Sequence, residues 1–257
     1  MSVTSGKPIA HAIITGAAGG IGRALAERFV ADGSSVGLID LDGPAAEAVA
    51  GALRARGHVA VSAQGDVTDT DSITAAVRTM SRSLEEQTGA AAIRTLITNA
   101  GVMSRVPLAE LDAAELDRCY RVNVLGTLLT FRAAHQWLAA ADEASVVTLS
   151  SGAGLNPASV TGPAYRLAKS GIISLTRILA TELKREGIRV NCIAPGGVDG
   201  GMAVAFSDDE LANMRAAALG TRLATLEEVA AAAAFAASGD ASFVTGAVIP
   251  VTGGVVF

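Results

Sequence analysis

The stretch that decides the fold is TGAAGGIG, residues 15–22. An apolar run, Ile9–Thr15, leads into it, and Gly20–Ala31 continues with apolar residues at helical spacing. Glycines between a strand and a helix let the chain turn sharply and bring backbone N–H groups close to a pyrophosphate at the helix N-terminus. This position predicts a nucleotide site, although a glycine-rich turn can also be a plain tight connection.

Outward from this stretch, apolar runs alternate with alanine-rich segments of helical length. Most of the runs are continuously apolar, which is typical of strands covered on both faces. This alternation predicts a single α/β domain over residues 1–257, with a Rossmann fold: a doubly wound parallel sheet of about seven strands and helices on both faces. The expected strands are Ile9–Thr15, Ser35–Asp40, Val59–Gln64, Ile93–Thr98, Ser145–Ser150, Ile188–Ala194 and Ala247–Val251. The expected helices are Gly20–Ala31, Pro44–Arg56, Thr70–Gln87, Ala113–Ala140, Pro163–Arg185 and Leu226–Ala237.

Composition argues against several classes of protein. Half of the 257 residues are hydrophobic, yet no uncharged apolar run approaches the roughly 20 residues of a membrane helix. The start, Met1–Pro8, lacks the basic region and apolar stretch of a secretory signal, so a cytoplasmic location is expected. The net charge is -5 with both signs interspersed, which offers no basic stripe for a nucleic acid. A small-molecule substrate is therefore the expected partner.

The cysteines and histidines form no pattern of metal ligands. Cys119 and Cys192 lie in apolar surroundings without a CxxC or zinc-type spacing, so both are interpreted as buried small hydrophobes. The histidines His11, His58 and His135 are scattered, and none lies near a serine or cysteine motif. No metal site is predicted.

An acid ends the second expected strand. Asp40 stands 24 positions after Gly16, where a Rossmann fold places the carboxylate that accepts hydrogen bonds from the adenosine ribose. A 2′-phosphate would meet that carboxylate, so the position favours NAD as the cofactor. A solvated acid that opens a turn is the alternative, and Asp42 is a second candidate for the same role.

A phenol and an ammonium are paired in YRLAK, residues 165–169. Tyr165 and Lys169 are four residues apart and hence lie on one face of a helix. Ionising a free tyrosine at pH 7 costs roughly 4 kcal/mol, and a neighbouring Lys⁺ reduces that cost. Such a tyrosine can exchange a proton with an alcohol or carbonyl near neutral pH. The pattern also arises by chance on helices, but the other tyrosine, Tyr120, has Val124 at the matching place.

The motifs of this chain and their order resemble those of the classical short-chain dehydrogenase/reductase family. The resemblance extends from about Ile9 to Gly254. The glycine stretch is similar to the family's TGxxxGxG, although Gly16, Gly19 and Gly22 also fit the TGxxGxxG of the extended relatives. The chain length, the NAG-like turn Asn99-Ala100-Gly101 and the spacing from Ser151 to Tyr165 favour the classical branch.

The resemblance implies a set of catalytic residues. The segment LSSGAGL, residues 149–155, resembles the family's SSxxGL, in which the second serine is catalytic; Ser150 remains the alternative to Ser151. Ser151 precedes Tyr165 by 14 positions, one more than is usual in the family. A serine hydroxyl can donate to the substrate oxygen and stabilise developing charge. Asn123 matches the helix asparagine whose backbone carbonyl, in the family, holds a proton-relaying water. The implied catalytic residues are Ser151, Tyr165, Lys169 and Asn123.

The resemblance also implies a set of cofactor-binding residues. The pair Asp66-Val67 after the third strand would contact adenine, and the NAG motif at residues 99–101 would shape the adenosine side of the site. The PGxV segment at residues 195–198 would border the nicotinamide. A surface loop and a plain β-turn are the alternatives for the first two. The implied residues are Gly16, Gly20, Ile21, Gly22, Asp40, Asp66, Val67, Asn99, Ala100, Gly101, Tyr165, Lys169, Pro195, Gly196 and Val198.

Some positions depart from the family pattern or refine it. Ala18 and Gly19 stand where members that use NADP often carry a basic residue, which again favours NAD. Gly200 stands near the place of a family threonine, so a hydroxyl contact to the cofactor is lost or replaced. Thr252 stands where aspartate is common.

The implied function is hydride transfer between NAD(H) and a secondary alcohol or ketone, with Tyr165 as general acid/base. An epimerase or dehydratase with the same Tyr/Lys pair is one alternative. A non-catalytic NAD-binding scaffold is another, but it predicts decay at the catalytic positions, which are all present. Family members pair the helices expected at Ala113–Ala140 and Pro163–Arg185 across subunits, so a homotetramer is expected, with a dimer as second choice.

The segment Asp199–Leu219 lies where the family builds its substrate lid. Gly200-Gly201 suits a hinge, and Asp208-Asp209-Glu210 resembles a helix N-terminus with acids facing solvent. An apolar cavity would suit an apolar ketone or alcohol and leave the hydroxyls of a sugar unpaired. The alternative is that the apolar side chains only pack the lid onto the core. The expected pocket wall is Met202, Val204, Phe206 and Leu211, joined by Val102, Met103, Leu155 and Val160.

Overall fold

A parallel sheet forms the centre of the molecule. The computed structural model describes residues 10–156 and 159–255, and these contain a seven-stranded sheet in the order β3-β2-β1-β4-β5-β6-β7. Every neighbouring pair is parallel. The predicted strands are confirmed with ends that shift by at most two residues, and Ile9 lies outside the described residues. The strands are β1 His11–Thr15, β2 Ser35–Asp40, β3 Ala60–Gln64, β4 Ile93–Thr98, β5 Ser145–Leu149, β6 Arg189–Pro195 and β7 Val248–Val251.

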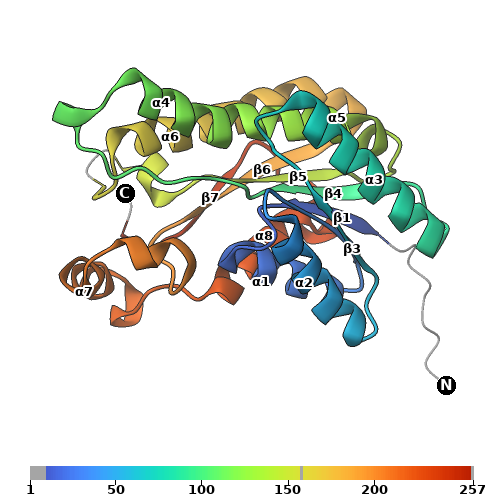
Figure 1. Ribbon diagram of the computed structural model, residues 1–257, viewed down its shortest axis with the longest axis horizontal. Helices are drawn as coiled ribbons and strands as arrows, with labels where there is room; N and C mark the ends of the chain where they lie inside the picture. Colours follow the sequence, from blue (N-terminus) through green and yellow to red (C-terminus); the bar gives the residue numbers. More distant parts are fainter. Residues whose placement is uncertain (1–9, 157–158, 256–257) are drawn as a thin grey trace.

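Helices cover both faces of the sheet, as the alternating pattern predicts (Figure 1). One layer contains α3, α4, α5 and α6, and the other contains α1, α2 and α8, while α7 stands apart beside the second layer. The helices are α1 Gly20–Ala31, α2 Gly43–Ala55, α3 Thr70–Thr88, α4 Ala113–Tyr120, α5 Gly126–Ala139, α6 Pro163–Leu183, α7 Asp208–Ala217 and α8 Leu226–Ala237.

The helix predicted over Ala113–Ala140 is not one regular α-helix. A π-helical segment, Arg121–Leu125, separates α4 from α5 while the backbone continues without a break. A π turn takes one more residue than an α turn, and such turns gather at functional sites. The spacing of apolar residues in the sequence cannot reveal the π turn, because contacts with the surrounding structure accommodate the extra residue. The turn includes Asn123, which is fully buried.

Two apolar layers hold the helices onto the sheet. Leu25 and Phe29 of α1 and Val229 of α8 pack on one face, and Ile73 of α3 and Phe131 of α5 pack on the other. Burying a side chain of this size contributes about 1.5–3 kcal/mol. The two cysteines, Cys119 and Cys192, are free and buried, as the sequence predicts.

The strand order places the ligand crevice. It reverses direction between β1 and β4, because β2 and β3 extend the sheet to one side of β1 and β5 to β7 extend it to the other. In open parallel sheets a ligand binds at such a switch point, outside the carboxyl ends of the strands. The glycine-rich stretch follows β1 at this edge.

Candidate functional site

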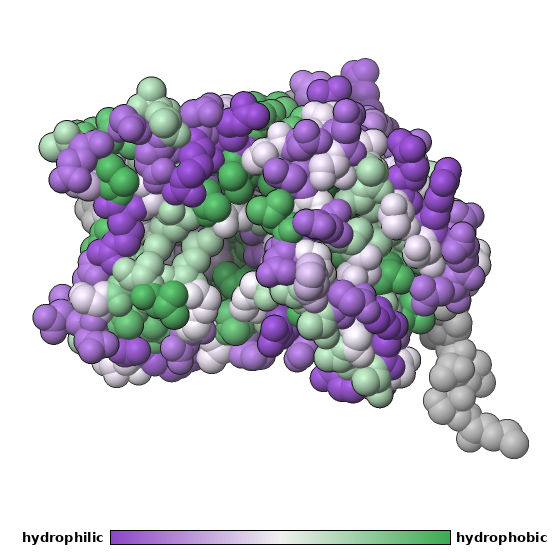
Figure 2. All heavy atoms as spheres, in the orientation of Figure 1, coloured by the Kyte–Doolittle hydropathy of each residue, from purple (hydrophilic) through white to green (hydrophobic). Residues whose placement is uncertain are grey.

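A cleft of about 840 Å³ lies along the carboxyl ends of the strands. Figure 2 shows it as a hollow with apolar walls between the two layers. Each predicted cofactor-binding residue lines it, from the glycine stretch after β1 to Val198 after β6. Three of the four predicted catalytic residues also line it, namely Ser151, Tyr165 and Lys169. Asn123 does not.

Two glycines after β1 are required by close contacts. Gly16 has a positive φ of 65°, and a Cβ on it would lie 2.7 Å from the Cα of Ala100. A Cβ on Gly22 would lie 2.1 Å from the carbonyl oxygen of Gly16. Gly20 is the first residue of α1, so the N-terminal N–H groups of this helix face the cleft beside Ile21. The loop can therefore receive an anionic group such as a pyrophosphate.

The NAG motif after β4 binds the glycine loop. Asn99 Nδ2 donates to the carbonyl oxygens of Thr15 at 3.1 Å and Gly16 at 2.9 Å, and the Ala100 N–H donates to Thr15 Oγ1 at 3.3 Å. These bonds join segments more than eighty residues apart in the chain. The motif is therefore more than a turn, because it holds the nucleotide loop in shape.

Of the two candidate acids after β2, Asp40 faces the glycine loop. Its Oδ2 accepts from the Ala18 N–H at 2.9 Å and its Oδ1 from the Asp42 N–H at 3.0 Å. Each carboxylate oxygen keeps lone-pair capacity for a ribose hydroxyl. Asp42 also lines the cleft, but its side chain caps α2 by accepting from the Ala45 N–H.

The part of the cleft after β3 is lined by Asp66 and Val67, the pair expected to contact adenine. One oxygen of Asp66 accepts from both the N–H and the hydroxyl of Thr68 at 2.8 Å, which fixes the turn after β3. Val67 is 8% exposed and packs so closely on Gly126 that a Cβ there would lie 2.7 Å away. A flat apolar base can lie against this edge.

Tyr165 and Lys169 lie together on α6, with the Lys169 Nζ 5.6 Å from the centre of the phenol ring. Lys169 Nζ donates to the Leu149 carbonyl at 2.9 Å. Burial raises the pKa of Tyr165 to about 12, and a hydrogen bond from Ser151 opposes this. Burial also lowers the pKa of Lys169 to about 8. The expected lowering of the phenol pKa by Lys169 is therefore not found, because burial of the phenol dominates and raises its pKa.

The two serines after β5 have separate roles. The Ser150 hydroxyl donates to the Lys169 carbonyl at 2.7 Å and so ties α6 to β5. The Ser151 hydroxyl accepts from the Ala153 N–H at 3.1 Å and lies close enough to the Tyr165 phenol to affect its pKa. Ser151 is therefore the serine available to a ligand.

Asn123 lies behind the cleft wall. Its Nδ2 donates to the carbonyls of Cys119 at 2.8 Å and Val102 at 2.9 Å, while its backbone carbonyl accepts from the Thr127 hydroxyl at 2.8 Å. Among the described residues its Oδ1 has no partner. A Cβ on Gly101 would lie 2.7 Å from this Oδ1 and 3.3 Å from the Lys169 ammonium nitrogen. Asn123 thus joins α4, the loop after β4 and α5 by hydrogen bonds, and it does not line the cleft.

The segment after β6 closes the cleft near the candidate catalytic residues. Pro195 ends β6, and Gly196 packs so tightly on Thr252 that a Cβ would lie 3.0 Å from its Cα. Val198 forms a parallel bridge with Ala224. Thr252, which stands where the family commonly has aspartate, is thus buried against Gly196.

The segment predicted as a lid carries part of the expected pocket wall. Gly200 and Gly201 have positive φ values of 95° and 56°, a backbone geometry that favours glycine. Met202, Phe206 and Leu211 line the cleft, as do Val102, Met103 and Val160 from neighbouring loops. Two members of the predicted wall are wrong: Val204 is 89% exposed, and Leu155 lies outside the lining.

Sequence reasoning missed several residues of the cleft. The lining also contains polar groups at Thr68, Asn156, Ser159 and Thr161, and apolar ones at Met214, Leu223 and Leu226. Gly154, within the LSSGAGL segment, packs so closely on α6 that a Cβ on it would lie 2.7 Å from the backbone of Lys169. These residues approach the cleft through the tertiary fold, and no local pattern identifies them.

Comparisons with known proteins agree over most of the chain. The family model described as enoyl-(acyl carrier protein) reductase matches residues 16–256. The chain is 38% identical over 244 residues to cis-4-hydroxycyclohexanecarboxylate dehydrogenase of Sinomonas cyclohexanicum, covering 95% of both chains. It is 37% identical over 247 residues to 2-(S)-hydroxypropyl-CoM dehydrogenase 3 of Xanthobacter autotrophicus, covering 94% of both. A 3-oxoacyl-[acyl-carrier protein] reductase from Brucella melitensis with bound NAD has a TM-score of 0.85 at 32% identity, over 96% of this chain and 91% of that one.

Fold and cleft define a Rossmann-type oxidoreductase. More closely, the chain belongs to the classical short-chain dehydrogenase/reductase family.

Proposed function

We propose that this protein transfers a hydride between NAD(H) and a secondary alcohol or ketone, with Tyr165 as general acid/base. The observation that carries the proposal is that Ser151 and Tyr165, which lie within hydrogen-bond reach of each other, line the same cleft as the glycine loop and Asp40. Relatives that are named dehydrogenases of hydroxy compounds, and a neighbour with bound NAD, support the same reaction class.

The residues of the chain divide the work in this proposal. The glycine loop, Asp40 and the NAG turn hold the dinucleotide, and Pro195, Gly196 and Val198 border the nicotinamide. When bound, the nicotinamide ring accepts or supplies the hydride. Ser151 donates a hydrogen bond to the substrate oxygen, and Tyr165 exchanges the proton of the same oxygen. Lys169 lies beside the phenol with its ammonium anchored on Leu149.

A fluorimetric screen for NADH tests the proposal. Alcohols, sugars, hydroxysteroids and hydroxyacids would be incubated with the protein and NAD, and the proposal expects NADH from a secondary alcohol. Substrate conversion without net NADH would instead identify the epimerase or dehydratase alternative, and binding of NAD without any conversion would identify the scaffold.

We further propose NAD as the preferred cofactor, because the Asp40 carboxylate would repel a 2′-phosphate. Asp40→Ala is expected to reduce the NAD-over-NADP ratio of kcat/KM by about tenfold, the effect of losing one hydrogen bond to a charged group. Asp42→Ala is the matched control: it removes the cap of α2, lowers stability by about 1 kcal/mol, and leaves the ratio unchanged. Equal wild-type efficiency with the two cofactors would contradict this prediction.

The substrate is proposed to be apolar. The cleft that Tyr165 lines has apolar side chains at Met103, Met202, Phe206 and Leu211, beside the polar groups already described. Phe206→Ala is expected to raise the substrate KM about tenfold, since apolar contact with the aromatic ring contributes about 1–2 kcal/mol to substrate binding. The KM for NAD should stay nearly constant, and Val204→Ala, on the exposed side of the same segment, should change neither. A strong preference for free sugars over apolar alcohols would refute the assignment.

A homotetramer in the cytoplasm is proposed for the assembled protein. Apolar side chains are exposed on α4, α6 and α8, including Leu116, Leu167, Ile178 and Phe235. Apolar surface of this kind is typical of subunit interfaces.

Within the residues that the structure describes, no helix is both long and apolar enough to cross a membrane.

A further inference from the structure

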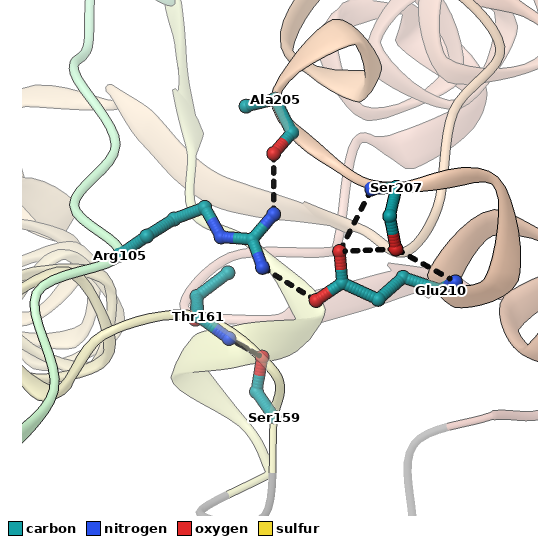
Figure 3. A network of polar contacts seen from close by, with 6 residues as sticks. All are labelled: Arg105, Ser159, Thr161, Ala205, Ser207 and Glu210. Carbon is teal, nitrogen blue, oxygen red and sulfur yellow. Dashed lines mark hydrogen bonds and ion pairs between the residues drawn. The ribbon is translucent and has the colours of Figure 1, made fainter.

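One arginine outside the predicted motifs joins the lid to the rest of the cleft. Arg105 lies in the loop between β4 and α4, and its guanidinium points across to the lid (Figure 3). It donates hydrogen bonds to the Ala205 carbonyl and to the Glu210 carboxylate. Its guanidinium carbon also lies 4.7 Å from the centre of the Phe206 ring. Three contacts on the lid, at Ala205, Phe206 and Glu210, therefore depend on a single side chain.

Glu210 has two functions at once. One carboxylate oxygen accepts from the Ser207 N–H at 2.8 Å and completes the capping box of α7, while the other pairs with Arg105. These partners, Arg105 first and the Ser207 backbone second, lower the pKa of Glu210 to about 2. The carboxylate therefore stays charged at all ordinary pH values. The acid was expected to face solvent, but its side chain is only 27% exposed.

The loop that carries Arg105 is itself fixed to the catalytic helix. The carbonyl of Ser104, which is buried, accepts from the N–H of Gly162 at 2.8 Å, and Gly162 is the N-cap residue of α6. A Cβ on Gly162 would lie 2.7 Å from the Val106 carbonyl oxygen, so loop and helix start are in close contact. A continuous path of contacts thus runs from the helix of Tyr165 through Arg105 to the lid.

We propose that Arg105 is a positioning residue that holds Phe206 as the wall of the substrate cleft, and so determines the selectivity for apolar substrates. This rests on the proposed function. An ordinary surface ion pair contributes little, but here the guanidinium binds two groups and stacks on the ring that lines the cleft, which fixes one orientation of that ring. The wall contacts ground state and transition state alike, so its loss raises KM more than it lowers kcat.

The test compares Arg105→Met with Arg222→Met. Arg222 is a matched control because it pairs in the same way with Glu228, the capping-box glutamate of α8. Arg105→Met is expected to raise the KM for an apolar secondary alcohol by about tenfold, with kcat and the KM for NAD within about twofold of wild type, the pattern of lost uniform binding. Arg222→Met should leave all three constants unchanged.

A double-variant cycle separates positioning from general damage. If Arg105 acts through Phe206, Arg105→Met should add nothing to Phe206→Ala, because residues in one contact network are not additive. Hydrogen exchange of the lid amides in the free protein should be about fivefold faster in Arg105→Met, since the lid loses its anchor. Additive effects in the cycle would overturn the positioning role.

The exchange measurement requires no substrate and so separates the two proposals. Unchanged lid exchange in Arg105→Met would overturn the inference, whatever the enzyme's activity. If lid exchange is faster in Arg105→Met but the wild-type protein oxidises no alcohol, the anchoring of the lid by Arg105 is supported and the proposed function is overturned. Glu210→Gln should reproduce the faster exchange, because glutamine can still cap α7 but cannot form the ion pair.

Discussion

Replacing Tyr165 by phenylalanine is expected to lower kcat about a thousandfold, within the range that general acid/base groups contribute. The phenol is 6% exposed, and its pKa is raised to about 12 by burial, so it keeps its proton throughout the neutral range and is the donor that the variant lacks. The ring itself still packs, and Lys169 keeps its bond to the Leu149 carbonyl. NADH should therefore bind with nearly unchanged affinity, measured by fluorescence titration beside steady-state rates.

Tyr120→Phe supplies the control for this experiment. Tyr120 is the other tyrosine of the chain and is 53% exposed at the end of α4, so its hydroxyl can be removed without effect on turnover. A Tyr165→Phe variant that retains more than about a tenth of the wild-type kcat would take Tyr165 out of the mechanism, since that residual activity is far above what loss of a general acid leaves.

Gly22→Ala is expected to have the largest effect on the cofactor side. Its Cβ would lie 2.1 Å from the Gly16 carbonyl oxygen, a contact that forces the glycine loop or α1 to move. Overpacking of this kind costs about 1–3 kcal/mol, which lowers Tm by roughly 2–4 °C per kcal/mol in a chain of this size. Because the displaced N–H groups are those facing the cleft, NADH affinity should fall more than about tenfold.

Gly19→Ala is the comparison for stability. Gly19 has a φ of -72° and a Cβ there would lie 3.6 Å from the same carbonyl oxygen, an ordinary contact. Thermal unfolding should therefore separate two substitutions of the same type, three residues apart in one loop. Equal Tm values for the two variants would show that the steric argument at Gly22 is wrong.

The structure gives different hydrogen-bond partners to the members of two pairs of side chains that the sequence left as alternatives. Asp42 caps α2, which leaves Asp40 to face the glycine loop. Ser150 binds the backbone of Lys169, which leaves Ser151 beside Tyr165. In both cases two equivalent side chains stand close together in sequence, and only the hydrogen-bond acceptors and donors around them distinguish their roles.

The sequence by itself determined the succession of strands and helices along the chain, the glycine loop and the Tyr165/Lys169 pair. These follow from the periodicity of apolar residues, the conformational freedom of glycine and the spacing of residues on a helix, which are all properties of short segments. The tertiary structure alone decided what depends on neighbours from elsewhere in the chain. It replaced part of the long helix with a π turn around Asn123 and raised the pKa of Tyr165 by desolvation. It also turned Val204 to solvent and brought Arg105 onto the lid, since burial and charge pairing arise only when distant segments meet.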